Sequence, residues 1–169
     1  MEKSRIIRAL IVGVMSAIAV MSTLYFNLPT WVLFMAWVSF FIFGKEPKQM
    51  ALCFTQIVIG IGIGVLLMLK SKFLTGYIGD AGLPIAVILI IATFMYLVPR
   101  LKPLNTIPIY FMGLIIFFGT HPELNFSEIG LVVLTLVTGF SFAWTTSKLE
   151  SILVNQQHNL TKSKVQYEN

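Results

Sequence analysis

Charged residues are scarce in this sequence, and their scarcity excludes an ordinary soluble domain. Asp, Glu, Lys and Arg make up 11% of the 169 residues, whereas soluble domains carry roughly a quarter. The charges lie at the ends of apolar segments, and no Asp, Glu, Lys, Arg or His falls in the middle of one. Proton relays and ion pumps need such groups at depth in the membrane, so a proton-coupled antiporter or a metal transporter is disfavoured.

Cysteine pairs, metal-ligand clusters and catalytic nucleophiles are also missing. The single cysteine, Cys53, lies in an apolar segment, which excludes an intrachain disulfide and indicates a small buried hydrophobe. His121 and Glu123 share one turn, but two potential ligands do not make a metal site. No nucleophile lies near a plausible base. We therefore expect no catalytic, metal-binding or cofactor-binding residues and no enzymatic activity.

Apolar residues dominate what is present. They make up 57% of the chain and come in helix-length runs, not in the alternating pattern of a membrane β-barrel. Because only helices and closed barrels can span a bilayer, the sequence predicts an all-α fold, a polytopic membrane helix bundle with the lipid bilayer as its partner. The net charge of +5 arises at segment ends, where basic residues act as topology signals, so no nucleic-acid binding is expected.

Six apolar segments are predicted to be transmembrane helices. They comprise residues 6–26, 28–43, 50–69, 83–98, 104–118 and 126–146. The second and fifth are short: 16 and 15 residues span roughly 24 and 22 Å, less than the ~30 Å hydrocarbon core. Residues 70–82 are expected to lie at the membrane interface. Residues 1–146 then form a single transmembrane domain, followed by a polar cytoplasmic tail at 147–169.

A short motif divides the chain into two similar halves. Phe43-Gly44-x-x-Pro47 returns 75 positions later as Phe118-Gly119-x-x-Pro122, and Gly64 returns as Gly139. This spacing predicts two three-helix repeats, 6–69 and 83–146. Three helices per repeat is an odd number, so the second repeat enters the membrane from the opposite side and the repeats are inverted. Inverted repeats with short, Pro-interrupted segments in matching positions are common in transporters and channels.

The distribution of Lys and Arg predicts the topology. With six crossings and a cytoplasmic N-terminus, ten of the twelve Lys and Arg residues lie inside, and only Lys70 and Lys72 lie outside. If the two short segments re-entered the membrane without crossing, fewer Lys and Arg residues would lie inside and more would lie outside. The positive-inside rule therefore favours six crossings, with both termini in the cytoplasm.

The region from about Leu24 to Ile152 resembles an uncharacterised bacterial inner-membrane family, domain of unknown function 1097. The resemblance rests mainly on the fifth segment, where Pro108-x-x-Phe111-x-Gly113-x-x-x-x-Phe118 is similar to the family's spacing of Pro, Phe, Gly and Phe. It implies a small multi-pass protein of the bacterial cytoplasmic membrane. It brings no substrate or catalytic residue to this chain.

Uncharged polar residues near the membrane segments suggest a function. Those that could line a solute path are Asn27, Thr30, Thr55, Gln56, Asn105, Thr106, Pro108, Thr135 and Thr138. Such a lining suits a channel or facilitator for a small neutral or weakly polar solute, or for a small anion drawn to the positive ends of short helices. The same side chains could instead form hydrogen bonds between helices. Six short helices leave little room for a wide path, so a homo-oligomer is expected.

Two other functions remain open. The chain could be a substrate-binding or accessory subunit of a larger transporter, docked through the small residues Ala9, Gly13 and Ala17 on the first helix, which would make other transporter subunits its partners. It could also be a structural or regulatory membrane protein without transport.

Overall fold

The chain folds as a bundle of helices in the computed structural model, which describes the backbone of residues 2–121 and 123–167 and the side chains of 5–121 and 123–154. The α-helices are α1 (Glu2–Tyr25), α2 (Thr30–Phe43), α3 (Pro47–Ile78), α4 (Gly82–Leu97), α5 (Ile107–Thr120) and α6 (Phe126–Tyr167). Two short 3₁₀ turns, Gly79–Ala81 and Val98–Arg100, flank α4. No strand occurs in the described backbone, so the prediction of an all-α fold is confirmed.

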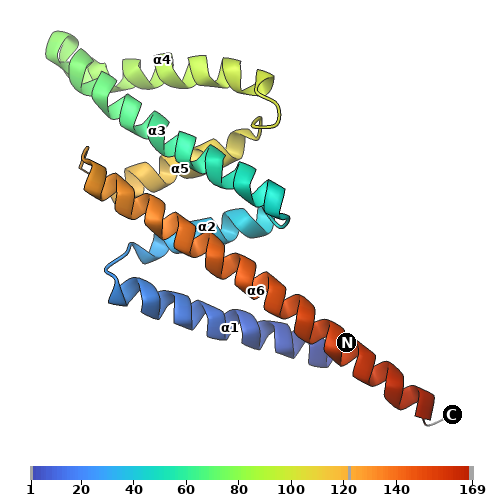
Figure 1. The fold of residues 1–169 in the computed structure, drawn as a ribbon. Helices are drawn as coiled ribbons and strands as arrows, with labels where there is room; N and C mark the ends of the chain where they lie inside the picture. The colour runs from blue at the N-terminus through green and yellow to red at the C-terminus, as the bar shows by residue number, and fades with distance from the viewer. Residues whose placement is uncertain (1, 122, 168–169) are drawn as a thin grey trace.

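Three stretches are long and apolar enough to cross a membrane by themselves: Arg5–Tyr25, Pro47–Arg100 and Phe126–Val154. Helices α2 and α5 are apolar but shorter, with 14 residues each, or about 21 Å. The chain reverses direction after each helix, so that consecutive helices run antiparallel (Figure 1). This composition and architecture are those of a membrane-embedded helical bundle.

Local sequence signals set most of the helix boundaries. Gly44 ends α2 and its N–H donates to the Phe40 carbonyl, while Pro47 occupies the first turn of α3, where its missing N–H costs nothing. At the start of α6, Asn125 Oδ1 accepts the Glu128 N–H at 2.8 Å, as an N-cap residue does. The two short helices were predicted within two or three residues of their observed ends.

The connectors differ from the sequence prediction at two places. Residues 70–78 continue α3 as helix, and Thr75 in this extension lies against Gly82 of α4. Residues 147–167 likewise continue α6 in backbone conformation, and their assignment to a cytoplasmic tail stays a prediction. Helix propensity persists through both polar stretches, which hold no Pro and, beyond Ser147, no Gly.

Helices from opposite halves of the chain pack together. In the main contacts α3 packs against α5 and α4, and α6 packs against α2 and α1. Close crossings depend on glycine: Gly60 of α3 lies against Tyr110 and Gly113 of α5, and Gly139 of α6 lies against α2, where an added Cβ would stand 2.7 Å from the Ala36 Cβ. Small residues at a crossing let two backbones approach closely.

The core lies along these crossings. One apolar cluster joins α2, α3, α5 and α6 through residues that include Leu33, Phe40, Ile57 and Leu136. A second cluster joins α3, α4 and α5 through Leu67, Val98, Tyr110 and their neighbours. The middle of the bundle, where α2 and α5 face α6 and α3, is thus filled with apolar side chains.

The register of the two halves differs from the motif-based prediction. Gly139 plays the part of Gly60, 79 positions earlier, and not that of Gly64. Gly44 is the residue after α2, whereas Gly119 lies inside α5, and Pro122 lies outside the described residues. The two Phe-Gly-x-x-Pro motifs therefore do not begin at equivalent helix positions, and the two repeats stay a prediction. Helices α2 and α5 are related by 77 positions, and the α5–α6 connection (121–125) is longer than the α2–α3 connection (44–46), which accounts for the change to 79.

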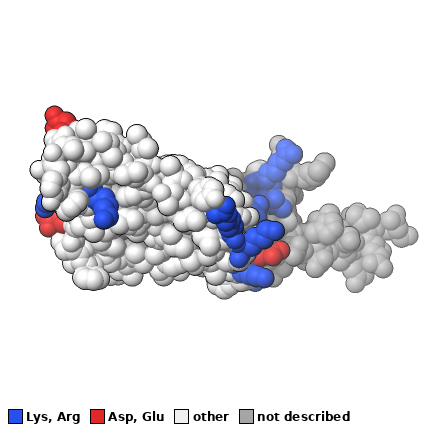
Figure 2. Space-filling model, turned by 90° about the horizontal axis from the view of Figure 1, so that it is seen from above, with Lys and Arg blue, Asp and Glu red and all other residues white. Residues whose placement is uncertain are grey.

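Charged side chains gather toward the two ends of the bundle and leave an uncharged surface between them on the face shown in Figure 2. One end, here called the basic end, carries Arg5, Arg8, Lys45, Lys48, Arg100, Lys102 and Lys148, with Glu46 and Glu150. The opposite end, here called the far end, carries Lys70, Lys72, Asp80, Glu123 and Glu128. Between Lys48 and Lys70 α3 has 21 uncharged residues, about 32 Å of helix, close to the ~30 Å thickness of the hydrocarbon core.

Candidate functional site: a vestibule at the far end

A hollow of ≈ 340 Å³ opens at the far end where α1, α2, α5 and α6 meet, and we call it the vestibule. The α1–α2 turn and the first turn of α6, which both contribute to its lining, lie at the same end of the bundle (Figure 1). Its lining consists of Asn27, Leu28, Pro29, Trp31, Gly119, Thr120, Glu128, Leu131 and Val132. The lining combines an amide, a hydroxyl, a carboxylate and an indole with apolar side chains, which is a composition suited to a small polar molecule.

The α1–α2 turn places its residues in the vestibule by a sharp chain reversal. Asn27 takes a left-handed conformation, with φ of 51°, which Asn tolerates better than most residues. The Leu28 N–H then donates to the Thr23 carbonyl at 2.8 Å, and the Thr23 and Thr30 hydroxyls are 2.8 Å apart. This turn fixes Pro29 and the first turn of α2 at the mouth of the hollow.

The other wall is formed by the end of α5 and the start of α6. Gly119 has no Cβ, which leaves room for the indole of Trp31 to lie against α5. The Thr120 hydroxyl donates to the Ile116 carbonyl at 2.8 Å and retains its lone pairs for another partner. Glu128 lies in the first turn of α6, where the helix dipole stabilises a carboxylate. The vestibule ends on the buried side chains of Leu28 and Val132.

The predicted path residues fall into three groups. Asn27 lines the vestibule, and Thr30 lies beside it through its bond to Thr23. Gln56 and Thr106 meet near the basic end, and Asn105 and Pro108 flank them on the exposed side. Thr55, Thr135 and Thr138 lie elsewhere, each with its hydroxyl donating to a carbonyl of its own helix.

The Gln56 contact is a side-chain link between α3 and the start of α5. Gln56 is buried, with 2% of its surface exposed. Its Oε1 accepts the Thr106 N–H at 3.0 Å, and its Nε2 donates to the Leu52 carbonyl at 3.2 Å. Tyr110 fastens the same region, because its hydroxyl donates to the Leu104 carbonyl at 2.6 Å. The two halves differ here, since Thr135, the residue 79 positions after Gln56, bonds only within α6.

Of the nine vestibule residues, sequence reasoning identified Asn27 and missed the others, among them Trp31, Gly119, Thr120 and Glu128. Thr120 and Glu128 flank a turn and read as ordinary cap residues, and Gly119 was assigned to the repeated turn motif. One sequence feature could have indicated them: Gly119 and Thr120 lie near a predicted helix end, and the carboxylate of Glu128 follows within ten residues. Their convergence depends on how α2 packs against α5 and α6, which no local pattern encodes. Within the described residues no three His, Cys, Asp or Glu side chains are grouped as a metal site would require.

Comparison with known proteins identifies one similarity. A family model described as "Protein of unknown function (DUF1097)" matches residues 9–150. No curated protein and no solved structure matches the chain.

Proposed function

The chain belongs to the DUF1097 family, and we propose that it is a six-crossing membrane protein of the bacterial cytoplasmic membrane that facilitates passage of a small, neutral polar solute. The observation that carries this proposal is the vestibule, a hollow at the far end whose lining includes Asn27, Thr120 and Glu128. A small anion is a weaker candidate, because the Glu128 carboxylate lines the entrance and would repel it.

The distribution of charge supports six crossings. Seven of the nine described Lys and Arg side chains lie at the basic end. This end is formed by the N-terminal part of α1, the α2–α3 turn, the α4–α5 connection and the residues near Lys148. The far end carries two Lys and three acidic residues. Under the positive-inside rule the basic end is cytoplasmic, and both termini are then on the cytoplasmic side.

The packing supports a pair of inverted repeats. Exchanging α1 with α4, α2 with α5 and α3 with α6 converts the α1–α6 contact into the α4–α3 contact and the α2–α6 contact into the α5–α3 contact. The same exchange matches two glycine contacts. Gly139 of α6 lies against Ala36 of α2, and Gly60 of α3 lies against Gly113 of α5. An odd number of helices per repeat makes the two halves antiparallel in the membrane.

The difference between the two ends suggests how passage would be gated. At the far end the vestibule is open above Leu28 and Val132, while at the basic end Gln56 ties the start of α5 to α3. Apolar side chains close the middle. A solute that enters the vestibule would therefore cross only when α2 and α5 move apart, which makes the short helices the moving parts and the Gln56 link a restraint on them.

Proteoliposome swelling tests this function. Vesicles containing the protein should swell faster than empty vesicles in glycerol, urea or another small neutral solute, and Thr120→Phe should slow the swelling because its ring fills the vestibule. Thr55→Phe is the matched control, since Thr55 is exposed on the outer face of α3. Equal rates for empty vesicles and wild-type vesicles across the panel would contradict the proposal and leave a structural or regulatory role.

A second candidate, an accessory subunit of a larger transporter, is favoured by α1. Ala9, Gly13 and Ala17 all lie exposed on α1, and a Cβ at Gly13 would meet no atom within 4 Å. This face is free for a helix of another subunit or of a second copy, which is also the geometry that the proposed homo-oligomer requires. Purification of the wild type and of Gly13→Leu from native membranes tests this candidate. A stoichiometric foreign subunit that accompanies the wild type and is lost in the variant supports it. Recovery of the chain alone in both cases contradicts it.

A further inference from the structure

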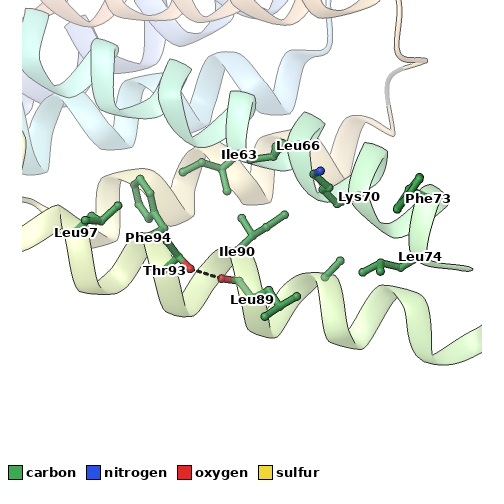
Figure 3. A pocket seen from close by; sticks show the side chains of 11 residues that line it. Ile63, Leu66, Lys70, Phe73, Leu74, Leu89, Ile90, Thr93, Phe94 and Leu97 are labelled. Carbon is green, nitrogen blue, oxygen red and sulfur yellow. Dashed lines mark hydrogen bonds between the residues drawn. The ribbon is translucent and has the colours of Figure 1, made fainter. Parts of the chain in front are cut away.

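We propose that the groove between α3 and α4 binds an anionic phospholipid, with one acyl chain in the groove and the phosphate at Lys70. The groove has a volume of ≈ 510 Å³. Figure 3 shows its two walls, which include Ile63, Leu66 and Lys70 from α3 and Leu89, Thr93 and Leu97 from α4. This inference is independent of transport, because it concerns a surface outside the vestibule.

The groove exists because α3 and α4 lie close together at the far end and separate toward the basic end (Figure 1). Near the far end Gly82 lies against the backbone of Thr75, and Ala86, one turn later, is buried. Near the basic end the rings of Phe94 and Tyr110 meet edge to face with centroids 4.8 Å apart. Along the side where the two helices separate, Leu66 and Leu89 stay 44% and 58% exposed.

Apart from Lys70 and Thr93 the lining is apolar, and it is long enough to hold one acyl chain. On α4 it repeats at helical spacing from Ala86 to Leu97, which is about 16 Å along the axis, half of the ~30 Å hydrocarbon core. Thr93 lies in this wall, and its hydroxyl is bonded to the Leu89 carbonyl at 2.7 Å (Figure 3). Because the Thr93 hydroxyl already has a hydrogen-bond partner, an acyl chain can lie against this wall without leaving a polar group unpaired.

Lys70 gives the groove its preference for a lipid with a negatively charged headgroup. It is the charged residue of the lining, and in Figure 3 it lies toward one end, with Phe94 and Leu97 toward the other. About 32 Å of uncharged α3 separates Lys48 from Lys70, so Lys70 lies at the depth of lipid headgroups when Lys48 lies at the other interface. A lysine at that depth attracts an anionic headgroup and extends its apolar stem along the groove.

Lipid retention measured by native mass spectrometry tests the site. The full-length protein in detergent is mixed with phosphatidylglycerol or with phosphatidylcholine of the same acyl chains. We expect about fivefold stronger retention of phosphatidylglycerol, the effect of about one basic residue near a membrane surface. Lys70→Gln should remove this preference, while Lys72→Gln, two residues away and outside the groove lining, should keep it.

Groove-filling variants test where the lipid lies. Leu89→Trp should lower retention of both lipids, whereas Ile88→Trp on the neighbouring exposed position should leave it unchanged. An unchanged elution profile in detergent verifies that each variant is folded. Equal retention of the two lipids by the wild type, equal effects of Lys70→Gln and Lys72→Gln, or a dimer that Leu89→Trp converts to monomer would each overturn the proposal, the last by showing that a second copy covers the groove.

Discussion

At the scale of single residues, the tightest packing depends on the absence of a side chain. Gly60 and Gly62 are two residues apart on α3, but Gly60 lies against the α5 backbone at Tyr110 and Gly113, while a Cβ at Gly62 would meet no atom within 4 Å. Sequence alone could not separate them, because both belong to the same row of alternating glycines. Only the direction in which α5 approaches α3 decides which glycine is required.

This difference gives the first prediction. Gly60→Ala should destabilise the protein by about 1–3 kcal/mol, because the new methyl group forces α5 away from α3. Gly62→Ala should leave stability unchanged or raise it slightly, since Ala has the higher helix propensity. Thermal unfolding in detergent measures both. Equal effects of the two substitutions would contradict the observed α3–α5 crossing.

At the scale of helices, a buried amide links α3 to α5. Gln56→Leu should destabilise the protein by about 1–3 kcal/mol, because it leaves the Thr106 N–H without its acceptor in an apolar setting. Thr55→Val, on the exposed side of the same helix, should cost little, since the Thr55 hydroxyl bonds only to the Ala51 carbonyl. Hydrogen exchange at the start of α5 should accelerate in Gln56→Leu alone. Protection unchanged at Thr106 would show that the link does not hold α5.

Much of the helical arrangement could be predicted from the sequence, because apolar runs and Gly or Pro punctuation are local signals. The order and type of the helices and the shortness of α2 and α5 follow from them. Two features could not be predicted. The extension of α3 through Lys70 to Ile78 needed the packing partner α4, whose Gly82 meets Thr75. The register of the halves depended on a turn longer by two residues, which a repeat search at one fixed offset cannot detect.

The same limit applies to the candidate site. Asn27, Thr30, Gln56 and Thr106 were identified by residue type, but the structure places them at two ends of the bundle. Polar residue type does not report which face of a helix is buried, so exposed Thr55 and buried Gln56 looked alike in the sequence. The vestibule emerges only when α2, α5 and α6 are packed together.

At the scale of the whole molecule, the function rests on the six-crossing topology, and the two connections that follow the short helices test it. Lys45 lies in the α2–α3 connection at the basic end, and His121 follows α5 at the far end (Figure 1). Both side chains are exposed. With Cys53 replaced by Ala, we expect His121→Cys to react with an impermeant thiol reagent in intact cells and Lys45→Cys to react only after permeabilisation, because the proposed topology puts the basic end in the cytoplasm.

The pattern of labelling decides between topologies. If α2 and α5 re-entered the membrane without crossing, positions 45 and 121 would both lie on the outer side, and both cysteines would react in intact cells. Reaction of both positions from the same side would contradict the antiparallel arrangement of the two halves. That result would remove the inverted repeats, and with them the reason for treating α2 and α5 as the moving parts of a solute path. Labelling at 121 alone places the vestibule on the outer surface, where a solute reaches it before the apolar crossing of Leu33 and Ala36 with Gly139.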